Sequence, residues 1–181
     1  MNIFAVDQNP VRAAHDLCDK HVVKMIVESC QMLSTAHRVL DGKPSIELSK
    51  SNRKVRRWTL EDPVKDAALC KATMVNHPCT RWAMQTDSNY GWLFDHTLGL
   101  LDAYTIRYDK RHSMQSLMPL LIEAPKNIPE GNLTPFAQAM PDQYRVANDG
   151  VTAYRRYYIG EKSRFAKWKV GSVPSWFVHK Y

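Results

Sequence analysis

The chain has 181 residues, of which 44% are hydrophobic, so it can bury a substantial core and is not expected to be disordered. Its 25 lysines and arginines against 18 acidic residues give a formal net charge of +7. This excess indicates a polyanionic partner, and nucleic acid is the commonest; an anionic membrane surface or simple solubility are the alternatives. No apolar run approaches the ~20 residues of a membrane span, so we expect no membrane-spanning segment.

The first helix expected from the sequence is a long one. Residues 2–6 are a short apolar run that can form a single strand or an extended lead-in. Asn9 can then cap a helix, and Pro10 suits its first position. The helical pattern continues almost to Gly42, which is a suitable stop. The sequence therefore predicts one helix over residues 10–40.

The segment 43–57 differs in character because basic residues crowd its second half. Five of them fall within eight positions: Lys50, Arg53, Lys54, Arg56 and Arg57. This pattern predicts an exposed basic loop or hairpin that ends at Trp58 and contacts nucleic acid. The alternative interpretation is a solvated run of charge.

The rest of the chain is expected to be helical with one irregular connection. The predicted helices cover residues 62–76, 79–85, 87–108, 113–121 and 148–168. Residues 122–147 hold four prolines and form a long connection of a kind that is often functional or poorly ordered. Strand signals, internal repeats and domain boundaries are not evident. We therefore expect a mainly α protein, with a single compact helical domain over residues 1–181.

One face of the predicted first helix places charged residues beside the core. His21 and Glu28 are seven residues apart, two turns along the same face, and Lys24 lies between them. The residues that flank this strip are Lys20, Gln31 and Thr35. A carboxylate at the border of a core can be partly desolvated, as a general acid or base requires. The alternative is a solvated polar face with an ion pair between Lys24 and Glu28.

The cysteines and the absence of cofactor motifs narrow the class of protein further. The four cysteines are Cys18, Cys30, Cys70 and Cys79, and none forms a C-x-x-C pair. We expect reduced, buried thiols in a cytoplasmic protein. His77 lies near Cys79 in sequence, but no second pair completes a zinc pattern. Neither a metal nor a cofactor is expected, since the sequence has no glycine-rich phosphate or dinucleotide loop.

Two short motifs resemble a known family. Leu17-Cys18-Asp19-Lys20-His21, with Glu28 seven residues after the histidine, resembles the first helix of the phage pyrimidine-dimer DNA glycosylases of the endonuclease V type. That family has an Asp-Gln-His triplet with its catalytic Glu at the same spacing. Pro174-Ser175-Trp176-Phe177 also resembles the family's Pro-Thr-Trp-Tyr near the C-terminus. The close matches are confined to these two segments.

The resemblance implies a fold, an activity and a set of catalytic residues. The fold would be an endonuclease V-like helical domain. The activity would be that of a base-excision DNA repair enzyme, a DNA glycosylase with or without AP-lyase activity, acting on a damaged or modified pyrimidine flipped out of duplex DNA. The implied catalytic residues are Glu28, His21 and Met1. The family's nucleophile is the amine of a Thr exposed when the initiator Met is removed. Here the size of Asn2 predicts that Met1 is retained, so either the Met1 amine takes that role or the lyase chemistry is absent.

The expected DNA contacts depart from the family at one position. The family places Arg residues beside its catalytic Glu, whereas Val27 and Gln31 stand there in this sequence. The expected nucleic-acid contacts are Lys20, Lys24, Gln31, Lys50, Arg53, Lys54, Arg56, Arg57 and Trp176. The partner is duplex DNA in a bacterial or phage-infected cell, and no membrane or obligate protein partner is expected.

Two other functions stay open on the sequence. The first is a phage transferase that hypermodifies a DNA base on the same scaffold, which loss of the Thr amine favours. The second is a non-catalytic nucleic-acid-binding protein in which Glu28 is merely an ion-pair partner. Charge reports only phosphate and does not separate DNA from RNA.

Overall fold

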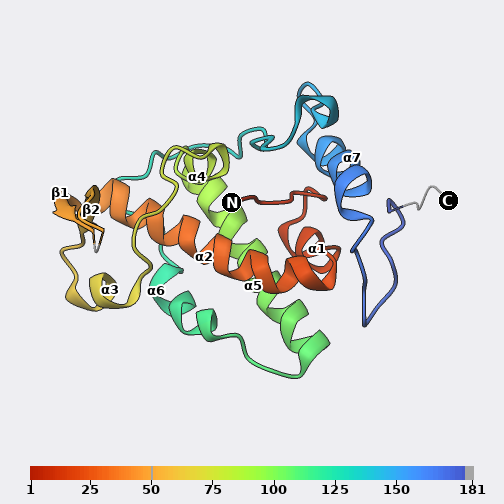
Figure 1. The fold of residues 1–181 in the computed structure, drawn as a ribbon, viewed down its shortest axis with the longest axis horizontal. Coiled ribbons are helices and arrows are strands. Elements are labelled where there is room, and N and C mark those ends of the chain that lie inside the picture. Colours follow the sequence, from red (N-terminus) through yellow and green to blue (C-terminus); the bar gives the residue numbers. More distant parts are fainter. Residues whose placement is uncertain (50, 178–181) are drawn as a thin grey trace.

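Helices dominate the computed structural model, which describes residues 1–49 and 51–177 (Figure 1). The α-helices are α1 Pro10–His15, α2 Asp19–Asp41, α3 Pro63–Ala68, α4 Pro78–Ala83, α5 Asp87–Tyr108, α6 Met118–Leu121 and α7 Gly150–Lys162. Two 3-10 turns, η1 Ser113–Leu117 and η2 Asp142–Tyr144, accompany them. Strands β1 Lys43–Leu48 and β2 Lys54–Thr59 pair as an antiparallel hairpin. The prediction of a mainly α protein is confirmed.

The core lies between the two longest helices, α2 and α5, which cross each other, with α1 packed beside α5 (Figure 1). Gly99 of α5 makes the close packing of α1 against α5 possible. A Cβ atom on Gly99 would lie 2.9 Å from the Cβ atom of Ala14 and 3.0 Å from the Cα atom of Val11. Only a glycine therefore lets α1 and α5 approach this closely. No helix in the described part of the chain is both long enough and apolar enough to cross a membrane.

The prediction of a single long first helix is wrong, because the helix is interrupted between α1 and α2. Arg107 of α5 donates to the carbonyl oxygens of His15 and Leu17, both at 2.7 Å. The hydroxyl oxygen of Tyr158, on α7, accepts the N–H of Cys18 at 2.8 Å. Distant side chains thus satisfy backbone groups that a continuous helix would pair internally. No local pattern reveals such partners.

The buried side chain of Arg38 ties the end of α2 to residues 58–70. Only 1% of this residue is exposed. Its Nη1 donates to the carbonyl oxygen of Trp58 at 2.8 Å and to the carboxylate of Asp66 at 2.6 Å. Its Nη2 donates to the carbonyl oxygens of Asp66 and Leu69, and its Nε donates to that of Cys70. These bonds use all five guanidinium donor positions.

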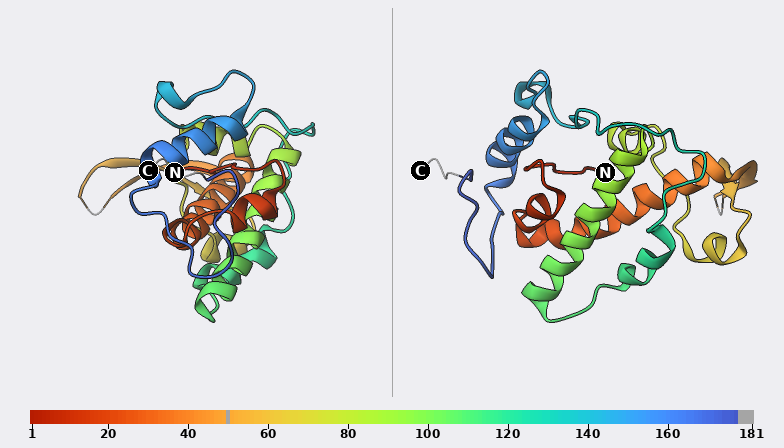
Figure 2. Two further views of the ribbon diagram at one scale, coloured as in Figure 1. Left: turned by 90° about the vertical axis from the view of Figure 1, so that its right-hand side faces the viewer. Right: turned by 180° about the vertical axis from the view of Figure 1, so that it is seen from behind.

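The remaining predictions differ from the structure mainly at element ends. α3 is much shorter than the predicted helix over 62–76, since the carbonyl groups after it turn inward to Arg38. The predicted basic loop or hairpin is a hairpin. α4 and α5 lie where short and long helices were expected, and α7 stops at Lys162, earlier than predicted. The Pro-rich connection 122–147 runs along the outside of the helices with η2 as its regular element (Figure 2).

Candidate active site

The amino terminus lies against the middle of α2, where its nearest charged partner is Glu28 (Figure 1). The Met1 nitrogen is 3.6 Å from Oε2 of Glu28. The same oxygen accepts the backbone N–H of Asn2 at 2.9 Å, and Oε1 lies 3.4 Å from Nζ of Lys24. The Glu28 side chain is 14% exposed. A largely buried carboxylate that meets an amine and an N–H group can hold the amine in place and exchange a proton with it.

The Asn2 side chain fixes the course of the chain beside this carboxylate. Its Oδ1 accepts the N–H groups of Ile3 at 2.8 Å and Phe4 at 3.1 Å. Its Nδ2 donates to the carbonyl oxygen of Ala139 at 3.0 Å. Phe4 takes a left-handed backbone conformation, with φ of 39°. Residues 2–6 therefore form an irregular lead-in whose direction is set by side-chain hydrogen bonds.

His21 supports the N-terminal segment through ring contacts. Its ring stacks on that of Phe4 with centroids 4.5 Å apart, and its Nδ1 lies 2.9 Å from the hydroxyl of Tyr158. Burial, reinforced by the charges of Lys162 and Lys24, lowers the pKa of His21 to about 4. The ring is thus neutral near pH 7. These contacts pack His21 against Phe4 of the lead-in that carries Met1, so His21 can help to hold the Met1 amine in position.

His77 is a site neighbour that the sequence did not single out for this role. The structure places His77 as the N-cap of α4, where its Nδ1 accepts the N–H of Cys79 at 3.2 Å. Burial lowers the pKa of His77, the charge of the Met1 amine lowers it further, and Glu28 raises it. One turn on, Oγ1 of Thr80 donates to the sulfur of Met1 at 3.7 Å. The start of α4 therefore forms a wall of the site.

A basic cluster lies on α2 and beyond the end of α7. Lys20 and Lys24 are exposed on α2, and Gln31 is half-buried further along it. Nζ of Lys20 lies 5.3 Å from the ring centre of Phe165, and the guanidinium of Arg164 lies 5.9 Å from the same centre. The sequence did not indicate Arg164, because it stands in what looked like a continuing helix. Its proximity to Lys20 follows from packing.

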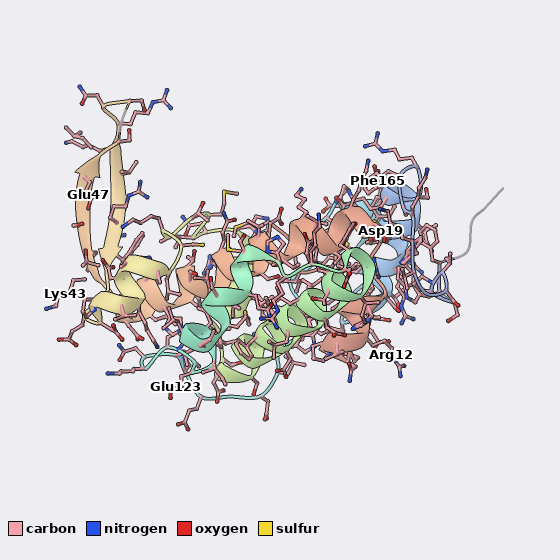
Figure 3. All side chains as sticks on the ribbon, turned by 90° about the horizontal axis from the view of Figure 1, so that it is seen from below. Arg12, Asp19, Lys43, Glu47, Glu123 and Phe165 are labelled. Atoms are coloured by element: carbon pink, nitrogen blue, oxygen red, sulfur yellow. The ribbon has the colours of Figure 1, made fainter. Side chains whose placement is uncertain are left out.

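The hairpin carries a second basic group at the other end of α2. Arg53, Lys54 and Arg56 are exposed there, and Arg57 lies 3.9 Å from a carboxylate oxygen of Glu47. Figure 3 shows the hairpin and Phe165 rising from the same side of the helical body at opposite ends. The predicted contact at Lys50 lies outside the described residues.

Trp176 occupies a packed position. Its indole Nε1 donates to the carboxylate of Asp16 at 2.7 Å, and its ring meets that of Tyr158 edge-on at 5.7 Å. The guanidinium of Arg155 lies 5.7 Å from the indole. These contacts cover the break between α1 and α2. The DNA contact expected of Trp176 stays a prediction.

The cysteines are free thiols, and three of the four are buried. Burial raises the pKa of Cys30 to about 12 and that of Cys79 to about 11, so neither is a thiolate near pH 7. The half-buried member is Cys70. Within residues 1–49 and 51–177, no group of three or more His, Cys, Asp or Glu side chains is arranged to hold a metal ion.

Fold and site together define a small, mainly helical protein with an amine–carboxylate pair between two basic surfaces. The chain belongs to the pyrimidine dimer DNA glycosylase family, whose sequence model matches residues 1–116. The match spans the lead-in, the hairpin and α1 to α5, and it confirms the family resemblance of the first motif. The C-terminal motif lies beyond it. Comparison with curated proteins and with solved structures gave no match. The family assigns the chain to the DNA glycosylases, enzymes that act on DNA in DNA repair.

Proposed function

We propose that this protein is a DNA glycosylase with AP-lyase activity that removes a damaged or modified pyrimidine flipped out of duplex DNA. In this proposal the Met1 amine is the nucleophile and Glu28 is its acid–base partner. The observation that carries it is the 3.6 Å separation between the Met1 nitrogen and the Glu28 carboxylate. An amine held beside a buried carboxylate is a recognised arrangement for an activated nucleophile.

The reaction begins with removal of a proton from the Met1 ammonium by Glu28. The amine nitrogen then attacks C1′ of the flipped nucleotide, and the N-glycosidic bond breaks with its electron pair leaving on the base. The released base takes the proton lost by the attacking nitrogen. The C1′–O4′ bond then breaks, O4′ takes the proton held by Glu28, and the resulting iminium ion covalently links enzyme and DNA. Loss of a C2′ proton then eliminates the 3′ phosphate, and water hydrolyses the imine to release the enzyme.

Glu28 serves this sequence in two ways. Its carboxylate accepts the proton from the amine, and its negative charge stabilises the positive charge that develops on the sugar. The bond from the Asn2 N–H keeps Oε2 directed at the amino terminus, while Lys24 contacts the other oxygen from the solvent side. Lys24 and Lys20 are the alternative amines, since both lie on the same helix.

The distribution of positive charge supports a DNA substrate that spans the site. Lys20, Lys24 and Arg164 flank Glu28 towards one end of the molecule, and the hairpin cations flank it towards the other. A glycosylase has to unstack its target base and hold the bent or opened duplex on both sides. Phosphate contacts on both sides provide that grip and make affinity depend on salt.

Borohydride trapping tests the proposal. The protein is incubated with duplexes that contain an ultraviolet photoproduct, an abasic site or hydroxymethyluracil, and sodium borohydride is added. We expect a covalent adduct that mass spectrometry locates on Met1. The matched control carries one extra residue ahead of Met1, which moves the amine away from Glu28. An adduct at Lys20 or Lys24 instead would reassign the nucleophile.

The other functions predict different results in the same experiment. A base-modifying transferase or a non-catalytic binding protein would bind the duplexes and give no adduct, no strand break and no released base. That result would contradict the proposal. Reaction with a base-modified duplex only after addition of a co-substrate would favour the transferase.

A further inference from the structure

The β-hairpin has two chemically different faces. Side chains alternate along each strand, and directly paired residues share a face. The register pairs Ile46 with Arg56 and Leu48 with Lys54. One face therefore carries Pro44, Ile46, Leu48, Lys54, Arg56 and Trp58, and the opposite face carries Lys43, Ser45, Glu47, Val55, Arg57 and Thr59. We refer to the first set as the Ile46 face.

The Ile46 face is both apolar and cationic, and it is open to solvent. Ile46 is 73% exposed and Leu48 is 65% exposed. The carboxylate of the hairpin, Glu47, lies on the opposite face with Arg57. Within the described ranges 1–49 and 51–177, neither Lys54 nor Arg56 takes part in an ion pair, and Arg56 lies over Trp58 at 5.5 Å. Exposed aliphatic groups between unpaired cations suit a partner that offers both negative charge and apolar contacts.

The base of the hairpin is held firmly to the helical body. Nη1 of Arg38 donates to the carbonyl oxygen of Trp58 at 2.8 Å, and the Asp66 carboxylate accepts the N–H of Leu60 at 2.9 Å. At the other strand, Gly42 fits so tightly that an added Cβ would lie 2.4 Å from the carbonyl oxygen of Arg38. The hairpin is thus an arm with a fixed direction.

The arm points to the side of the molecule that carries the amine. The left panel of Figure 2 shows it extending from the side on which the N-terminus lies. Glu28 and Asp41 are thirteen residues apart on α2, and thirteen helical residues span about 20 Å. That length corresponds to about six base pairs of duplex at 3.4 Å each.

We propose that the Ile46 face enters the major groove of the duplex about six base pairs from the flipped nucleotide. Ile46 and Leu48 contact thymine C5-methyl groups, and Lys54 and Arg56 bind the adjoining phosphates. The major groove, about 12 Å wide, admits a two-stranded β-ribbon in an undeformed duplex, whereas the minor groove, about 6 Å wide, has to be opened before it can take one. The stated distance from the flipped nucleotide rests on the proposed function; the groove contact does not.

Binding to duplexes with altered flanks tests this contact. The probe is a duplex with a non-cleavable tetrahydrofuran abasic analogue and thymines four to eight base pairs away on both sides. A matched probe has uracil, which lacks the methyl group, at those positions, and gel analysis verifies that it stays intact. The variants are Ile46→Ser with Leu48→Ser. The control is Val64→Ser with Ile122→Ser, which removes aliphatic groups of similar exposure, 63% and 66%, outside the hairpin.

We expect the hairpin double variant to bind the thymine probe about tenfold more weakly than the unaltered protein, and the control to bind normally. Uracil should weaken the unaltered protein several-fold and leave the hairpin variant unchanged. Shortening the flank to four base pairs on one side alone should reproduce the loss. Equal affinity of all proteins for both probes would overturn the proposal. Weak binding of the variant, together with equal affinity of the unaltered protein for the thymine and uracil probes, would overturn the major-groove assignment.

The outcome is separable from that of the proposed function. Borohydride trapping on a duplex with the four-base-pair flank tests the amine chemistry without the arm. Trapping on this duplex, together with binding that does not depend on the flank, would support the glycosylase proposal and contradict the groove contact of the Ile46 face. Flank-dependent binding without trapping on any duplex would support the groove contact and contradict the glycosylase proposal.

Discussion

The carboxylate of Glu28 lies 3.6 Å from the amino group of Met1, although the first belongs to the middle of α2 and the second to an irregular segment. The contact therefore depends on how residues 2–6 pack. His21 supports that segment through Phe4, and Asn2 ties it to Ala139. The geometry of the candidate site is thus a property of tertiary packing, which gives it several points at which substitution can separate chemistry from stability.

Glu28→Gln keeps the size of the side chain and removes its charge. We expect the single-turnover rate of base release to fall by roughly 10² to 10⁴, as for loss of a general acid–base group. Affinity for the tetrahydrofuran duplex should change little. The matched control is Glu123→Gln, at an exposed position. Full activity in Glu28→Gln would contradict both roles proposed for Glu28, as proton acceptor for the amine and as stabiliser of the positive charge on the sugar.

Asn2→Leu keeps the approximate size of a buried side chain and removes its three hydrogen bonds. The N–H groups of Ile3 and Phe4 and the carbonyl of Ala139 lose their partner. We expect the amine to be misplaced and the single-turnover rate to fall roughly a hundredfold, a loss typical of 1 Å displacements. DNA affinity should hold. A lower melting temperature with an unchanged rate would show that Asn2 stabilises the fold without positioning the amine.

The two roles of His77 can be separated by its replacement. His77→Asn retains a good N-cap for α4, whereas His77→Ala removes the cap and should cost about 1 kcal/mol of stability. We expect both variants to lose several-fold in single-turnover rate, since both remove the ring beside Met1 and Glu28. Full activity in His77→Asn would limit His77 to capping.

The elements that the sequence predicted well are those set by local signals. Asn9 and Asp62 each cap a helix by accepting a nearby backbone N–H group, so such helix starts can be inferred from neighbouring residues. Glu28 was identifiable because helical spacing places it at the border of the core. The break before α2 was not, because its partners Arg107 and Tyr158 are far away in sequence.

The same limit applies to the site. That Met1 reaches Glu28 could be inferred only from the family resemblance, since nothing local directs residues 2–6 across α2. His77 and Arg164 enter the site region through packing between elements that the sequence does not relate. A buried arginine such as Arg38 is also invisible in a sequence rich in basic residues, because its burial depends on acceptors from three segments.

Three buried histidines should make stability fall in mild acid. Burial lowers the pKa values of His21, His37 and His96 to about 4, whereas unfolded histidine titrates near 6.5. Between these values the unfolded chain binds more protons, so the free energy of unfolding is full above about pH 6.5 and is lost as pH falls towards 4. The loss is roughly 3 kcal/mol per histidine.

Urea denaturation between pH 4 and 7 measures this dependence. The three buried rings together should contribute close to three protons to the proton uptake on unfolding near pH 5, which the slope measures. His37→Gln removes one of the three groups, so its slope should be smaller by about one proton. A pH-independent free energy of unfolding over this range would contradict the assignment of neutral buried rings.

Arg38→Met should lower the free energy of unfolding by more than a substitution at the surface does. The change leaves the Asp66 carboxylate and the carbonyl groups of Trp58, Leu69 and Cys70 without their donor. Loss of one partner of a buried ion pair costs about 3–5 kcal/mol. Arg38→Lys should recover little, because an ammonium has three donors where the guanidinium uses five. The control Arg81→Met, at an exposed position, should stay within about 0.5 kcal/mol. Arg38 also anchors β2, so Arg38→Met should both lower the melting temperature and abolish the dependence of DNA binding on the flank. A folded but destabilised variant that keeps the flank dependence would contradict this anchoring role.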